Sequence, residues 1–449
     1  MKQNQDLRKA LALILAMFML AFSGCSHSAP ESVGASEGSG EPAKTEKQTV
    51  AVCMDMDIGH EGQSTSLLKD IIKDCVPEFM ESYELEIESV PGTGSDREPA
   101  LDRIRVEMMA GEGPDLFLCV SPRAADPYLM PPRERETGLF PYPRAMMKRK
   151  MFLPLDEYIE GAEYMEWDKL YPEIMAAGKN DEGQQILPIS WSMDFTRFDA
   201  ESYTPPEGLP MTFGEMLESN DPGIKYAILY SGFGGSLGML ADYENDAPAF
   251  TEEELMAQLE GHRENHEHRT MELSESLGHP SEVTLGRLNA SLFTQYDPDS
   301  VLIPQYNRNG GATANITTFG AVNINTKAPE GAFRILDVLM SKEVQRDSEL
   351  FSMDRGAPVH MELLSSEEKV NAPFERANGK TEPKWWLSDY NYDRLQELIK
   401  QINAVDFVTP VHHELTELYR TYMQAETPEE REKLAGKAYT EIKMMLAES

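Results

Sequence analysis

The chain has 449 residues, of which 77 are Asp or Glu and 41 are Lys or Arg, so its formal net charge is −36. Proteins that bind nucleic acid non-specifically rely on Lys and Arg to neutralise phosphates, so this acidic balance excludes that class of partner. After an N-terminal targeting segment about 400 residues remain, which is enough for two or three domains with hydrophobic cores.

The first 25 residues have the pattern of an export signal. Three basic residues precede the apolar run 10–22, which is shorter than the stretch of about 20 apolar residues that spans a bilayer. The run ends in FSGC, which resembles the lipobox of bacterial lipoproteins and implies lipid attachment at Cys25. Residues 26–48, rich in Ser, Gly, Glu, Ala and Pro, are expected to form a flexible tether. Cleavage nearby as an ordinary signal peptide is the alternative.

The first part of the body alternates between strand and helix patterns. An apolar run predicts a strand at 49–56, helical spacing from Leu68 to Phe79 predicts a helix, and strict alternation predicts a strand at 85–90. A second amphipathic helix from 101 closes at a Gly-containing turn and leads to a buried strand at 116–119.

This order is typical of an α/β fold, in which ligands bind beyond the carboxyl ends of the strands. Four polar residues follow the predicted strands and are therefore expected at the binding site: Asp55, Asp57, His60 and Ser121.

The remaining elements are predicted from the same patterns. Strands are expected at 226–230 and 315–325, and helices at 251–276, 331–340, 395–402 and from Thr427 to Leu446. Thr212 with Glu215 three residues later predicts a capping box at a helix N-terminus.

Several of these segments resemble one protein family in their residues and in the order in which they occur. AGEGPD at 110–115, before an apolar strand, is similar to the extracellular solute-binding proteins of ABC importers, in the sugar-binding branch that includes maltose-binding protein. Further matches follow in the family's order: FLPLD at 152–156, GQQILP at 183–188, LPMTF at 209–213, and the series VNIN, LMSKEVQ and GAPV between 322 and 359. The resemblance implies that 183–188 is a strand.

The resemblance implies a two-lobed, type II periplasmic-binding-protein-like α/β fold whose lobes are joined by a hinge. Lobe one would comprise 47–191 plus 321–363, and lobe two 192–320 plus 364–449, with crossings near 192–194 and 320–323. The implied function is capture of a sugar or oligosaccharide in the interlobe cleft and its delivery to an ABC permease. The protein would be a monomer without a cofactor, anchored through Cys25 at the extracellular face of the cell membrane.

Sugar sites pair aromatic side chains, which bury the apolar faces of the ring, with polar groups that fix its orientation. Trp191 and Asp194 lie at the first predicted crossing, and Tyr230 and Phe233 flank a glycine cluster after a predicted strand. Trp167 is expected to have a packing role. The full set of ligand-binding candidates is Asp55, Asp57, Ser121, Trp191, Asp194, Tyr230, Phe233, Trp385 and Trp386.

Some alternatives stay open at this stage. Cys53, Cys75 and Cys119 are read as buried thiols, with a Cys53–Cys119 disulfide as the alternative. The stretch that contains His262, His266 and His268 is typical of a solvated helix, and the alternative is that its histidines bind a metal ion. A hydrolase with paired carboxylates is the enzymatic rival, although the chain contains no HExxH motif. A lipoprotein that senses the solute for a signalling receptor would have the same fold.

Overall fold

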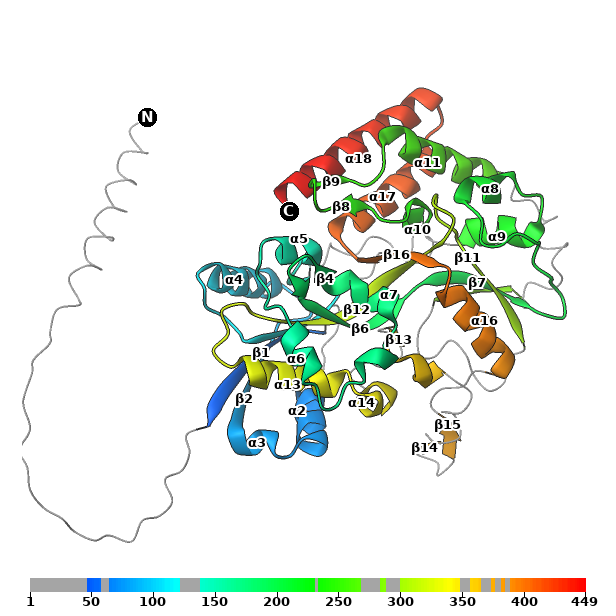
Figure 1. The fold of residues 1–449 in the computed structure, drawn as a ribbon. Helices are drawn as coiled ribbons and strands as arrows, with labels where there is room; N and C mark the ends of the chain where they lie inside the picture. Colours follow the sequence, from blue (N-terminus) through cyan, green and yellow to red (C-terminus); the bar gives the residue numbers. More distant parts are fainter. Residues whose placement is uncertain are drawn as a thin grey trace, which may run out of the picture. The chain divides into compact units, whose positions relative to one another are not determined.

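The computed structural model describes residues 47–57, 64–121, 138–230, 233–267, 283–287, 299–347, 356–364, 373–375, 381–383 and 388–449. Residues 47–449 form one compact unit (Figure 1). The predicted signal, the lipidation site Cys25 and the tether to residue 46 lie outside the described residues.

A seven-stranded sheet organises this unit, with strand order β13-β6-β12-β3-β1-β2 and β16 also paired to β12. β1, β2 and β3 are parallel, whereas β12 runs antiparallel to β3 and β6. The strands are β1 (Gln48–Asp55), β2 (Tyr83–Ser89), β3 (Leu116–Val120), β6 (Ile186–Ser192), β12 (Ala312–Val322), β13 (Ala357–Pro358) and β16 (Ile402–Phe407).

The long strand β12 has two different partners along one edge. Its residues 312–316 pair with β16 in parallel, and its residues 318–322 pair with β3 in antiparallel fashion. The carboxyl ends of β3 and β16 therefore face each other beside residues 316–318. Along its other edge β12 pairs with β6, with two register shifts around Thr318.

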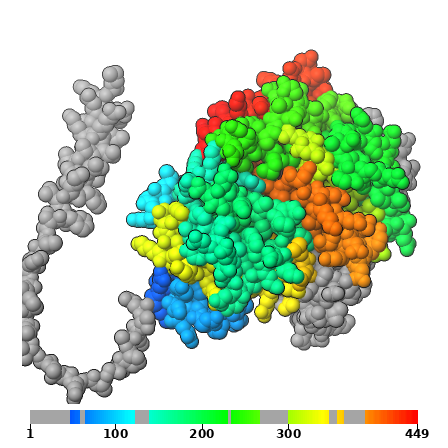
Figure 2. Space-filling view, viewed as in Figure 1, coloured from blue at the N-terminus to red at the C-terminus, as the bar shows by residue number. Residues whose placement is uncertain are grey.

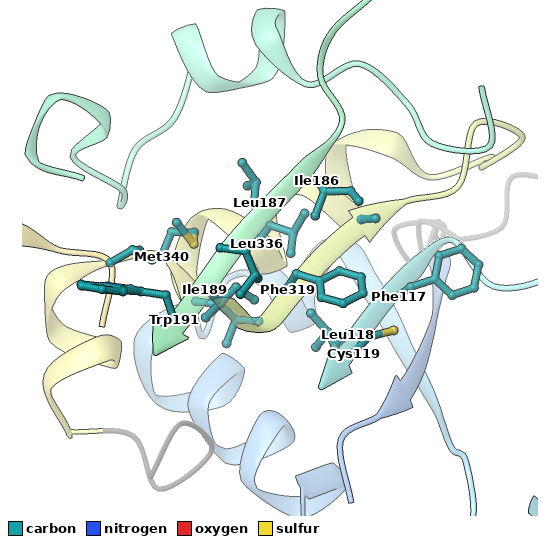
Figure 3. Packing of buried hydrophobic residues seen from close by; sticks show 14 of the residues in the cluster. Phe117, Leu118, Cys119, Ile186, Leu187, Ile189, Trp191, Phe319, Leu336 and Met340 are labelled. Carbon is teal, nitrogen blue, oxygen red and sulfur yellow. The ribbon is translucent and has the colours of Figure 1, made fainter. Parts of the chain in front are cut away.

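Helices cover the main sheet, and Figure 1 shows α2 and α13 side by side against it. The helices of this part are α2 (Ser64–Cys75), α3 (Phe79–Ser82), α4 (Arg97–Met109), α5 (Pro143–Lys148), α6 (Asp156–Glu160), α7 (Pro172–Met175), α13 (Pro329–Leu339) and α14 (Lys342–Asp347). Their apolar faces and the sheet form one continuous core, part of which is drawn in Figure 3.

β6 continues directly into β7 (Asp194–Asp199), the central strand of a second, three-stranded sheet with order β10-β7-β11. Two smaller cores accompany this sheet, and Figure 1 shows α11, α17 and α18 packed together. The elements are β10 (Val283–Arg287), β11 (Ser300–Pro304), α8 (Phe213–Glu218), α9 (Pro222–Tyr230), α10 (Phe233–Leu237), α11 (Glu252–Glu267), α16 (Asp389–Ile399), α17 (Pro410–Gln424), α18 (Pro428–Glu448) and the hairpin β8 (Ala241–Asp242) and β9 (Ala247–Pro248).

α16 joins the two parts, because its apolar residues belong to the core of the main sheet. Gln396 Nε2 on α16 donates a hydrogen bond of 3.1 Å to the hydroxyl of Tyr171. In the space-filling view the surface of α16 lies directly beside that of the segment around α7 (Figure 2). Trp167 also packs against the main core, as predicted.

The predicted strand at 226–230 is wrong, because these residues end helix α9. A short apolar run fits a buried strand or a buried helix equally well, and the residues before it decide here. Asp221 accepts a hydrogen bond from the backbone N–H of Ile224, which caps the helix, and Pro222 occupies its first turn. Ile224, Ala227 and Ile228 then fall on one buried face.

The other predicted strands and helices are confirmed within the described residues, with shifted ends; residues 268–276 of the helix predicted at 251–276 lie outside them. Thr212 and Glu215 form the predicted capping box at α8, and Thr427 caps α18. The three cysteines among the described residues are free thiols. Cys53 and Cys119 are buried as predicted, whereas Cys75 is only partly buried. β1 and β3 are neighbours, but their register places Cys119 opposite Asp55 and Phe117 opposite Cys53, so the disulfide alternative is not found.

Candidate functional site

The candidate site lies where the carboxyl ends of β3, β6 and β16 meet the middle of β12. Ser121 follows β3 and donates its backbone N–H to the carbonyl of Thr317 at 2.8 Å. Ser192 ends β6 and is the register partner of Asn315 on β12. Segments that are far apart in sequence therefore present polar side chains at one place.

Four uncharged polar side-chain atoms at this place are buried and have no hydrogen-bond partner among the described residues. They are the hydroxyls of Ser121, Ser192 and Thr318 and the carbonyl oxygen of Asn315. A buried polar group without a partner costs about 1–3 kcal/mol, so such groups rarely gather without a function. Hydroxyl and amide groups can bond the hydroxyls of a polar, uncharged molecule.

The backbone around these groups is held tightly. Ser190 Oγ and Thr317 Oγ1 lie 2.9 Å apart and form a hydrogen bond across the strand pair. Gly356, before β13, has φ +112, and a Cβ there would collide with the carbonyl oxygen of Trp191 and with Thr317 Oγ1. Only glycine fits this position, which explains the first residue of the GAPV segment.

Asp55 lies at the end of β1, as predicted, but neighbouring residues already use its carboxylate. Arg97 donates two hydrogen bonds to it, of 2.8 and 3.2 Å, and the backbone N–H of Leu139 donates another of 2.7 Å. Burial raises the pKa of Asp55, and the Arg97 guanidinium opposes that rise. The arrangement suits a buried ion pair that ties 138–140 to the sheet.

Asp57 is also buried, and Ser64 Oγ donates a hydrogen bond of 2.5 Å to its carboxylate at the start of α2. Asp194 begins β7, directly after the strand that carries Ser192, and is partly exposed. His60, Trp385 and Trp386 lie outside the described residues.

Two of the aromatic candidates, Trp191 and Phe233, lie in cores. Trp191 is completely buried, donates Nε1–H to the carbonyl of Pro358 at 3.1 Å, and meets the ring of Tyr171 edge-on. Figure 3 shows Trp191 among the core residues of the main sheet, with Ile189 and Met340. Phe233 is 4% exposed and stacks on Tyr419. Tyr230 is the last residue of α9, a helix end and not the predicted strand end.

Sequence reasoning found Ser121 because it follows a strand, but it missed Ser192, Asn315 and Thr318. Small polar residues within apolar strands resemble the ordinary alternation of polar and apolar residues. No local pattern distinguishes those at a binding site from the others. The available signal was that Ser192 stands inside the predicted crossing, between Trp191 and Asp194.

Two sequence motifs that are associated with catalysis or metal binding have packing roles in this structure. Residues 234–238, GGSLG, match the G-x-S-x-G motif of serine hydrolases. That motif needs an exposed serine on a strand-to-helix turn, whereas Ser236 lies within α10, is fully buried and donates its hydroxyl to the carbonyl of Phe233. The structure does not give Ser236 the setting of a nucleophile.

The predicted histidine stretch forms α11, but His262 points into a core. It stacks on Phe213 with ring centroids 4.8 Å apart, and burial lowers its pKa to about 3. His268 lies outside the described residues. Within the part of the chain that the structure describes, no cluster of three His, Cys, Asp or Glu side chains could hold a metal ion.

No family model matches the chain, and no curated protein matches it. Solved structures match over most of its length. The sugar-binding protein MalE from Xanthomonas citri matches with a TM-score of 0.55 and 10% identity, over 89% of this chain and 98% of its own. An extracellular solute-binding protein of family 1 from Alicyclobacillus acidocaldarius gives 0.54 and 12%, over 90% and 99%.

A periplasmic oligogalacturonide-binding protein from Yersinia enterocolitica gives a TM-score of 0.53 and 14% identity, over 89% of this chain and 99% of its own. These likenesses show the fold. The chain has the α/β fold of the type II periplasmic and extracellular solute-binding proteins, as the sequence resemblance predicted.

Proposed function

We propose that this chain captures a carbohydrate, as a sugar or oligosaccharide, between two α/β lobes and delivers it to an ABC permease. The observation that carries the proposal is the set of buried, unpartnered polar groups of Ser121, Ser192, Asn315 and Thr318, where strand ends from both parts of the chain converge. Neighbours of the same fold are named for sugar or oligogalacturonide binding, which agrees with a hydroxyl-rich ligand.

The proposed lobes are 47–191 plus 321–363 and 192–320 plus 364–449. Sugar hydroxyls both donate and accept, so serine and threonine hydroxyls and an amide oxygen can all pair with them. Binding would favour the closed arrangement because the ligand touches both lobes only when they are together. We propose binding without catalysis.

A thermal-shift panel tests the proposal, because a ligand that binds only the folded state raises the melting temperature. The panel would hold glucose, maltotriose, mannotriose and trigalacturonate. We expect at least one oligosaccharide to raise the Tm in proportion to the logarithm of its concentration. A panel without any shift, repeated by calorimetry, would contradict a carbohydrate function.

Ser192→Ala then tests the site. Loss of one hydrogen bond to the ligand should weaken binding by roughly 1 kcal/mol. Thr196→Val is the matched control, because Thr196 is also buried with an unpaired hydroxyl but lies inside β7, paired with Leu285 of β10 and Ile303 of β11, and not at the strand ends that form the site. Equal affinities for Ser192→Ala, Thr196→Val and the unmodified protein would remove Ser192 from the site.

We also propose that the mature chain is anchored to the membrane by a lipid on Cys25. Among the described residues, no helix is long and apolar enough to cross a bilayer. The proposal of an anchor is supported by the FSGC segment, which resembles a lipobox. Cys25→Ala should release the protein into the medium or leave its precursor unprocessed, and an unchanged membrane fraction at the original mass would refute the anchor.

A further inference from the structure

We propose that Gln305 is a further ligand-contacting residue of this binding site and that His262 orients its side-chain amide. The inference rests on the proposed function. It places a specificity-determining contact in the part of the chain that contains β7 and β11. None of the four unpaired groups described above lies on either of these strands; Asn315 and Thr318 lie on β12.

The position of Gln305 brings it to the site. It directly follows β11, where Pro304 pairs with Phe195, so Gln305 lies at the end of β7 that begins with Asp194. A Cβ on Gly235 would be 3.4 Å from Gln305 Oε1. The carbonyl of that same Gly235 accepts the hydroxyl of Thr313, two residues before Asn315 on β12.

Only one end of the Gln305 amide has a partner. Its Nε2 lies 3.2 Å from Nε2 of His262, within hydrogen-bond distance. Its Oε1 has no partner among the described residues, although the side chain is only 4% exposed. Whichever way the amide is turned, one terminal atom bonds the imidazole and the other is unpaired.

His262 is fixed by three aromatic rings. Its imidazole stacks on Phe213 at 4.8 Å and meets Phe233 and Tyr419 edge-on at 5.2 and 5.5 Å between centroids. An imidazole held in this way fixes the amide that bonds to it, because rotation of the amide would break their hydrogen bond. The unpaired atom of Gln305 is therefore presented in one direction.

Gly235 lies next to that atom. A Cβ at this position would be 3.4 Å from Gln305 Oε1, so glycine keeps side-chain atoms away from the unpaired end of the amide. A fixed amide with one free terminal atom can distinguish a hydroxyl from a hydrogen at the matching sugar carbon, because loss of the partner leaves it unpaired again.

The test uses the mature full chain and the panel sugar that stabilises it most, by calorimetric titration. Gln305→Leu removes the amide at similar volume and should weaken binding about tenfold. The matched control is Gln185→Leu, since Gln185 is also buried with an unpaired Oε1 but lies at the amino end of β6, the end opposite Ser192. Its affinity should stay within twofold of the unmodified protein.

A double-mutant cycle tests the orienting role of His262. His262→Phe keeps a ring within the aromatic cluster but removes the hydrogen bond, so it should weaken sugar binding, and the combination with Gln305→Leu should weaken it no further. A purely structural His262 would lower the Tm and leave the two effects on Kd independent.

The outcomes separate this inference from the proposed function. If no panel sugar binds the unmodified protein, the proposed function fails and the inference falls with it. If a sugar binds and Gln305→Leu binds it as tightly as Gln185→Leu does, the inference alone is overturned.

Discussion

At the scale of single residues, most buried charged and aromatic side chains near the strand ends are committed to the fold. Asp55 is bound by Arg97 and the Leu139 backbone, and Trp191 by Pro358 and Tyr171. The unpaired groups that define the candidate site are neutral: the hydroxyls of Ser121, Ser192 and Thr318 and the carbonyl oxygen of Asn315. Asp55 and Trp191 therefore have partners within the fold, whereas the spare hydrogen-bonding capacity of small polar side chains shows only in a structure.

Trp191→Ala should mainly destabilise the protein. The side chain is fully buried in the main core, so its removal should lower the free energy of unfolding by about 3–5 kcal/mol. Urea unfolding measures this, with Trp167→Ala as a control, because Trp167 is only partly buried and should cost less. A loss below that of Trp167→Ala would argue against the core position of Trp191.

The buried histidines predict how stability depends on pH. Burial lowers the pKa of both His262 and His412 to about 3, whereas the unfolded chain has the ordinary value of 6.5. Between these pKa values the unfolded state binds more protons than the folded state. The free energy of unfolding therefore has its full value above pH 6.5 and falls as the pH is lowered. Each histidine contributes up to about 1.4 kcal/mol per pH unit.

His262→Phe should make this slope shallower between pH 6 and 5, whatever its effect on stability at pH 7. Urea unfolding at several pH values measures the slope. The same slope in His262→Phe and the unmodified protein would show that His262 is protonated in the folded state.

At the scale of elements, periodicity predicted most helices and strands correctly because each buries one face. The helix α9 was missed since a five-residue apolar run lacks the length that separates helix from strand, and the deciding cap at Asp221 precedes it. The capping box at α8 was predictable because its signal is local: a Thr and a Glu three residues apart.

Thr212→Ala should remove one of the two reciprocal hydrogen bonds of that box and cost about 1 kcal/mol of stability. Thr440→Ala is the matched control, because Thr440 is exposed in the middle of α18 and bonds only a carbonyl of its own helix. Denaturant midpoints for both variants measure the difference, and equal values would mean that the box contributes nothing.

At the scale of the whole molecule, α5, which belongs to the first proposed lobe, contacts residues of the second proposed lobe. Lys148 donates to the carbonyls of Tyr243 and Glu244 and to the Asp246 carboxylate, all on the β8–β9 hairpin. Arg144 donates to the carbonyl of Val405 on β16. These contacts join the proposed lobes outside the strands that connect them, so opening of the lobes would have to break them.

Lys148→Met should therefore shift ligand-free protein toward more open forms and raise its radius of gyration in small-angle scattering. The shift should be modest, a few-fold in the equilibrium, because exposed ion pairs contribute about 1 kcal/mol or less. Lys150→Met is the control, since Lys150 pairs with Glu182 within one proposed lobe. Identical scattering of the two variants would show that α5 does not restrain the lobes.

The architecture of the sheet could not be derived from local pattern. Strand β12 lies between β3 and β6, although it follows β6 by more than a hundred residues, and no periodicity reports such a pairing. The resemblance to a known family supplied the fold class. The site within it needed the structure, because Ser121, Ser192 and Asn315 come together only through that long-range pairing.

The late position of β12 also sets an order on folding. Until residue 322 has been synthesised, β3 and β6 each lack the neighbour that joins them, and both have an open edge in the middle of the future sheet. The first two hundred residues of the chain thus contain most of the main sheet without the strand that closes it. Pairings this distant in sequence form slowly, because the long intervening loop must be closed first. A nascent chain of this protein is accordingly most exposed to aggregation in the interval between the completion of β6 and the arrival of β12.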